Sequence, residues 1–118
     1  MTLEDLVEAL RHDVPEVHDL LRAHLAYLPG GDEFVLLALL RDRAYELFKA
    51  KNIDAFDRLL ALVDLALAKG DEELADAVSS DFIADTPPWD PRMDPFVAAW
   101  PVHLRAQAAV ETARHQHY

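Results

Sequence analysis

The 118 residues suffice for one small domain with its own core, and the 52% of apolar residues sets the chain apart from disordered proteins. The absence of cysteine excludes a disulfide framework and a thiolate zinc site. The net charge of -11 argues against a broad basic surface for phosphate backbones, so we expect no direct nucleic-acid ligand.

Neither a membrane anchor nor a secretory signal is evident. No apolar run reaches the length that a membrane-spanning helix needs, and the N-terminal stretch MTLEDLVEALRHD carries acids where a signal peptide carries basic residues. We therefore expect one helical domain over residues 1–118, in the cytoplasm.

A helical hairpin is predicted at the start of the chain. Thr2 can cap a first helix by accepting from the backbone N–H of Asp5. Pro15 suits the first turn of a second helix, which Pro29-Gly30-Gly31 should end. Apolar residues follow helical spacing in both segments: Leu3, Leu6, Val7 and Leu10, then Val17, Leu20, Leu21, Leu25 and Leu28.

Two further helices should form the centre of the fold. Asp32 is a good N-cap for the third helix, and Asn52 or Asp54 can start the fourth. Both are apolar over more than one face, which is typical of central helices. The expected core includes Leu37, Leu40, Phe48, Leu59, Leu60 and Val63.

The remaining chain should contain two more helices around a proline-rich segment. Gly70 is predicted to end the fourth helix in the usual C-terminal glycine position, and Asp71 to cap a fifth. Residues 86–95 cannot be helical throughout because of their prolines, and we expect a stiff, extended crossing. A sixth helix should begin near Pro95, break near Pro101 and end in a frayed HQHY tail.

These segments predict an all-α fold of about six helices, arranged as stacked helical hairpins, either HEAT-like or as an irregular bundle. Gly31-Asp32-Glu33 and Gly70-Asp71-Glu72 lie 39 residues apart, a period that suits paired-helix repeats. Ordinary helix-start chemistry explains this match equally well.

No catalytic or metal-binding motif is found. The spacing of His18 and His24 places them on different parts of a helix surface, and His115 and His117 lie in the tail, so we expect no metal site. No nucleophile elbow and no glycine-rich phosphate loop is present. We therefore expect neither enzymatic activity nor a cofactor.

The negative charge is concentrated in one stretch, since residues 71–95 sum to -7. Two interpretations apply: a solvated face with Trp89 as a lid on the core, or a binding surface with Trp89 as an anchor held by prolines. Under the second, the partner-binding residues are Glu72, Glu73, Asp76, Ser80, Asp85, Trp89, Asp90 and Asp94.

The stretch KGDEELADAVSSDFI, with Trp100 after it, resembles small helical bacterial proteins of immunity type over about residues 53–100. This resemblance implies a protein that binds and neutralises a toxin. The segment TPPWDPRMDP departs from the aromatic-rich or glycine-containing approach to the last helix expected of that group.

The leading hypothesis is therefore a non-enzymatic immunity protein that occludes a bacterial toxin, with a basic toxin domain as its protein partner. One alternative is a self-associating adaptor or structural module, a homodimer in which Trp89, Phe96 and Trp100 pack against a second copy. Another is a phage-type inhibitor that mimics nucleic acid through its carboxylates.

Overall fold

The computed structural model describes residues 1–27 and 32–116, and every regular element within them is helical. A π-helical segment, η2 (Val78–Ala84), and two short 3₁₀ helices, η1 (Pro15–Val17) and η3 (Pro91–Met93), accompany the α-helices. The α-helices of these residues are α1 (Leu3–Asp13), α2 (His18–Tyr27), α3 (Glu33–Lys49), α4 (Ile53–Lys69), α5 (Glu72–Ala77), α6 (Asp94–Ala98) and α7 (Val102–Gln116). The all-α prediction is confirmed. The described residues hold seven α-helices against about six expected, because the sixth is divided near Pro101 as predicted.

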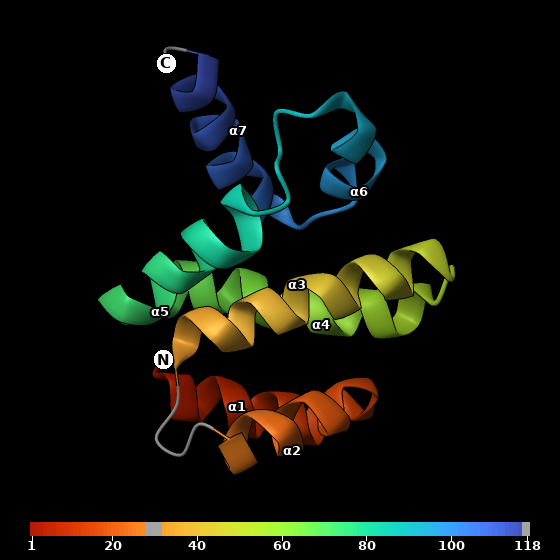
Figure 1. The fold of residues 1–118 in the computed structure, drawn as a ribbon, viewed down its shortest axis with the longest axis vertical. Coiled ribbons are helices and arrows are strands. Elements are labelled where there is room, and N and C mark those ends of the chain that lie inside the picture. Colours follow the sequence, from red (N-terminus) through yellow and green to blue (C-terminus); the bar gives the residue numbers. More distant parts are fainter. Residues whose placement is uncertain (28–31, 117–118) are drawn as a thin grey trace.

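The helices stack along the longest axis of a molecule that measures 39 × 31 × 23 Å. The α1–α2 hairpin forms one end, α3 and α4 cross the middle, and α6 and α7 form the other end (Figure 1). Contacts of α1 with α4 and of α2 with α3 join the first two hairpins. The predicted Pro29-Gly30-Gly31 turn and the last two residues of the HQHY tail lie outside the described residues.

Helix starts follow the predicted capping chemistry in three places. Thr2 and Asp5 form a capping box, in which the Thr2 hydroxyl accepts from the Asp5 N–H at 3.2 Å and the Asp5 carboxylate accepts from the Thr2 N–H at 2.9 Å. Asp32 caps α3, and Asp71 caps α5. Asn52 precedes α4, but its side chain makes no capping hydrogen bond.

Two arginines clamp the first hairpin onto the second. Arg43 of α3 donates both guanidinium nitrogens to Asp19 of α2, at 3.0 and 2.8 Å, and one nitrogen also to the Glu16 carbonyl. Arg58 of α4 makes a similar fork to the Glu16 carboxylate, at 3.1 and 2.9 Å. The Arg43 hydrogen bonds lower the pKa of Asp19 to about 2, and those of Arg58 lower the pKa of Glu16.

The core runs through all the helical layers, as the apolar pattern predicts. Leu37, Leu40, Leu59, Leu60 and Val63 are buried, whereas Phe48 is half-buried against the core. Phe96 is buried at the centre of an aromatic cluster, in which it contacts Tyr45, Phe48, Phe56 and Trp100. This cluster ties the C-terminal third of the chain to α3 and α4.

Gly70 ends α4 as predicted, but glycine is required there by space rather than by a left-handed backbone conformation. Its φ of -67° is open to any residue. A Cβ atom at Gly70 would instead lie 2.2 Å from the Ala66 carbonyl oxygen. The left-handed position occurs after α3, where Lys51 has a φ of 61°.

A side chain from a distant helix accepts a backbone N–H at the start of α7, after the break at Pro101. Pro101 ends the preceding turn, and the first N–H groups of α7 then need partners. Asp64 of α4 supplies one, because its carboxylate accepts from the Leu104 N–H at 2.9 Å and bonds the His103 ring at 2.8 Å. This contact fixes the start of α7 against α4.

Candidate functional site

The predicted acidic helix exists, with its carboxylates in water. Glu72, Glu73 and Asp76 are exposed, as is Ser80, whose hydroxyl donates to the Asp76 carbonyl at 3.0 Å. The opposite face consists of the buried side chains Leu74, Ala77, Val78 and Phe82. This division follows the helical spacing of the sequence.

The second half of this helix is π-helical, which the sequence does not reveal. The segment η2 continues α5 directly, and the Asp85 N–H donates to the Ser80 carbonyl, five residues earlier, at 3.2 Å. Asp85 follows its last residue and is exposed. Short π-helical segments are frequent at functional sites, so this geometry draws attention to the same surface.

The proline-rich segment after η2 is not the extended crossing that we expected. It folds into consecutive turns, because the Asp90 N–H donates to the Pro87 carbonyl and the Asp90 carboxylate accepts from the Arg92 N–H, which starts η3. Its first residue is anchored as well, since Arg41 donates to the Thr86 carbonyl at 3.0 Å. Side-chain capping therefore overrides the extended preference of residues before proline.

Trp89 has features of both interpretations, the lid on the core and the anchor at a binding surface. The side chain is half-buried, and its ring stacks on His115 of α7 with the centroids 4.1 Å apart and the planes at 5°. His115 continues the helix face that carries the buried Leu104 and Ala108. Trp89 thus extends that packing at the end of α7 while part of its surface stays open to solvent.

Part of the predicted set lines one groove, here called the η2–α7 groove, with a volume of about 430 Å³. Asp76 and Ser80 belong to it, together with Phe34, Ser79, Ala84, Glu111 and Arg114. Phe34 is 40% exposed there. The sequence gives no signal for Phe34, Glu111 or Arg114, because Phe34 lies on α3 and the other two on α7, all more than 25 positions from Asp76 and Ser80.

Other predicted residues lie outside this groove. Glu72 and Glu73 occupy the first turn of α5. Asp94 begins α6 and lines a second groove between α6 and α7, of about 460 Å³. Asp90 is engaged by Arg92 at 2.7 Å. The structure therefore divides the predicted set over neighbouring surfaces rather than joining it in one pocket.

Most of the charge of residues 71–95 is left unneutralised. Residues 71–95 hold eight carboxylates, and among the described residues Asp90 alone pairs with a cation. They are Asp71, Glu72, Glu73, Asp76, Asp81, Asp85, Asp90 and Asp94. In the groove, Arg114 is already paired with Glu111 at 3.2 Å, so it does not neutralise Asp76.

Asp81 is affected by burial and also by the negative charge of its neighbours. Its side chain is half-buried on η2, and burial raises its pKa, assisted by the nearby charges of Asp85 and Asp32. Nothing in the sequence spacing separates Asp81 from its solvated neighbours, so the sequence alone does not predict this environment.

One predicted interface is not available. Phe96 and Trp100 were assigned to the homodimer alternative, but they are 1% and 2% exposed. Their rings fill the aromatic cluster in the core, so they cannot pack against a second copy of the folded chain.

Residues 1–27 and 32–116 contain no candidate metal cluster and no helix that could span a membrane. No group of three or more histidine and acidic side chains is arranged to hold a metal ion. No helix in these ranges is long and apolar enough to cross a membrane.

Comparisons with known proteins identified no relative of this chain. No family model matches the chain, and neither a curated protein nor a solved structure gives a significant match.

Proposed function

We propose that the chain is a non-enzymatic binding protein that neutralises a bacterial toxin by occluding it. The binding surface consists of the exposed face of α5 and η2 with the turns that follow, here called the acidic face. Its partner is a basic toxin domain, such as a nuclease. The resemblance of residues 53–100 to immunity-type proteins supports the same class.

The observation that carries this proposal is the unpaired charge. Elsewhere on the molecule several carboxylates pair with arginines, as Asp19 does with Arg43 and Glu16 with Arg58, whereas on the acidic face Asp90 alone has a cationic partner among the described residues. Concentrated charge of one sign disfavours folding through self-repulsion, but it steers an oppositely charged partner into contact. A basic partner would supply the missing cations.

The η2–α7 groove gives this surface a place for a partner's cationic side chain. Asp76 offers an unpaired carboxylate, the Ser80 oxygen accepts hydrogen bonds, and Phe34 exposes part of its ring. A lysine or arginine entering the groove would combine a charge-assisted hydrogen bond with a cation–π contact. A cytoplasmic location is part of this proposal, because the chain has no cysteine and immunity proteins act where their toxin would harm the host.

Co-expression tests the proposal. The chain is produced together with candidate basic toxin domains, beginning with those encoded beside its gene, and growth of the host is scored. We expect protection by the native chain and weaker protection by the triple variant Glu72→Lys, Glu73→Lys, Asp76→Lys.

The matched control reverses three exposed acids elsewhere, Glu4, Glu8 and Asp57, and should protect like the native chain. Equal protection by both triple variants would remove the acidic face from the mechanism. Failure to protect against any basic domain would contradict the toxin-neutralising function itself.

A further inference from the structure

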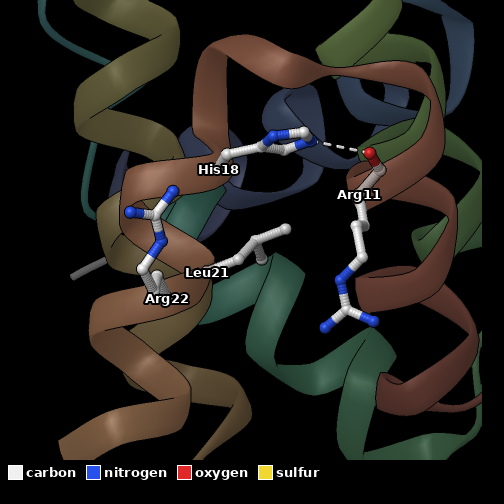
Figure 2. Close-up of a pocket in the computed structure, with 4 residues that line it drawn as sticks. All are labelled: Arg11, His18, Leu21 and Arg22. Atoms are coloured by element: carbon white, nitrogen blue, oxygen red, sulfur yellow. Dashed lines mark hydrogen bonds between the residues drawn. The ribbon is translucent and has the colours of Figure 1, made fainter.

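One cavity in the α1–α2 hairpin has a cationic lining. A cavity of about 340 Å³ lies between α1 and α2 and is lined by Arg11, His18, Leu21 and Arg22 (Figure 2). Three of these four side chains can carry positive charge, and none is acidic. Such a lining is unexpected in a chain with a net charge of -11.

Ordinary structural roles account for only part of this cluster. The His18 Nε2 donates to the Arg11 carbonyl at 2.7 Å, which satisfies an end of α1 and leaves Nδ1 without a partner among the described residues. Arg11 pairs with Glu8 at 3.1 Å, but both side chains are at least half exposed, so this pair is weak. A competing anion can therefore displace Glu8.

Arg22 has no such role. Six of the eight arginines pair with a carboxylate in the described residues, and Arg22 and Arg105 are the two that do not. Figure 2 shows the Arg22 and Arg11 side chains on either side of Leu21 in this view, with His18 above them. Leu21 is 3% exposed and forms an apolar floor between the charged groups.

We propose that this α1–α2 cavity binds the phosphate group of a small phosphomonoester. The lining offers two guanidinium groups and an imidazole, and their many N–H donors suit the several oxygens of a tetrahedral phosphate better than the two coplanar oxygens of a carboxylate. The volume lies at the lower end of the range for small-molecule sites and exceeds what a phosphate alone needs. The organic part of the ligand would lie over Leu21.

This site is separate from the acidic face, because its four lining residues belong to α1 and α2 and none belongs to α5, η2 or the turns that follow. Toxin neutralisation and phosphate binding can therefore fail or succeed separately.

Nuclear magnetic resonance titration tests the proposal with two probes, inorganic phosphate and phenyl phosphate, at constant ionic strength. Both should shift the His18 ring and the Arg11 and Arg22 side-chain signals in a saturable way. Phenyl phosphate should bind more tightly, because its ring can cover Leu21. Benzoate, which carries a carboxylate on the same ring, should bind more weakly than phenyl phosphate.

Arg22→Gln should weaken phenyl phosphate binding about ten- to a hundredfold, the effect of losing a charge-assisted hydrogen bond. Arg105→Gln removes the other unpaired arginine, on α7, and should leave binding unchanged. Equal loss in both variants, equal binding of benzoate, or shifts that sodium chloride reproduces would overturn the assignment, since each would indicate charge screening or unspecific anion contact. Tighter binding of inorganic phosphate than of phenyl phosphate would overturn the phosphomonoester.

Discussion

Trp89 stacks on His115 with the ring centroids 4.1 Å apart and the planes nearly parallel, at 5°. The contact joins the turns after η2 to the end of α7, which lie 26 positions apart in the sequence. Trp89 therefore holds two segments of the molecule together while remaining half-buried. A role in folding and a role at an interface are both open to it, and they can be separated by experiment.

The stack should appear as an energetic coupling between the two residues. We expect Trp89→Ala and His115→Ala to destabilise by less in combination than the sum of the single effects, with a coupling of about 0.5–1.5 kcal/mol. Urea denaturation of the four proteins in the double-mutant cycle measures it. Strict additivity would mean that the rings touch without stabilising the end of α7.

Leu60 should be among the most sensitive core positions. It is 1% exposed on α4, so Leu60→Ala should lower the free energy of unfolding by about 2–5 kcal/mol. Leu65→Ala, five residues along the same helix and 42% exposed, is the matched control and should cost no more than about 0.5 kcal/mol. Similar losses for the two variants in denaturant titrations would place the inner face of α4 elsewhere.

The Asp19–Arg43 pair should make stability depend on acid pH. The pKa of Asp19 in the folded protein is about 2, against an ordinary value of 3.8. A carboxyl group whose pKa is lower in the folded than in the unfolded protein stabilises the fold at pH values above its unfolded pKa. The contribution of Asp19 is therefore present above pH 3.8 and is lost as the pH falls toward 2. It should be no larger than about 1 kcal/mol, because the carboxylate is mostly exposed.

Asp19→Asn should therefore flatten the decline of stability in this pH range. Asp57→Asn, which removes an exposed carboxylate with no ion pair in the described residues, should keep the native slope. Unfolding free energies measured at several pH values decide the matter, and equal slopes in all three proteins would show that Arg43 does not stabilise the ionised Asp19.

Ionised Asp81 should lower the stability of the fold, whereas ionised Asp19 raises it. Burial raises its pKa, so ionisation at neutral pH opposes folding, and Asp81→Asn should raise the melting temperature at pH 7. The difference from the native chain should shrink as the pH falls through the raised pKa. Asp76→Asn, at an exposed position of α5, should change the melting temperature little. A lower melting temperature for Asp81→Asn would mean that its carboxylate is favourably bonded in the fold.

Local chemistry made much of the fold predictable. Thr2, Asp32 and Asp71 cap helices as expected, because each needs only the backbone of the next three residues. Long-range contacts were not predictable in the same way. Asp64 accepts from the Leu104 N–H at the start of α7, 40 residues away, and the residues around Asp64 in the sequence do not predict this contact.

The candidate site shows the same limit. The helical period correctly placed Glu72 and Asp76 in water, but it could not show that η2 is π-helical or that Phe34 and Glu111 would line a groove with Asp76. Proline content suggested an extended segment, whereas Asp90 folds it into turns through its own capping bonds. Side-chain capping is a local effect, but composition does not show whether it outweighs the extended conformation that residues before proline prefer.

The association rate constant shows most directly whether the acidic face steers a basic partner. Surface-plasmon kinetics against the toxin domain found by co-expression should be recorded at low and physiological ionic strength, after thermal melts confirm that each variant folds. Reversing Glu72, Glu73 and Asp76 to lysine should slow association at least about tenfold and reduce its salt dependence, because exposed charges act by steering. Reversing Glu4, Glu8 and Asp57 should leave it much closer to the native rate. An association rate that is the same for the native chain and the acidic-face variant at both ionic strengths would show that the acidic face does not steer the partner.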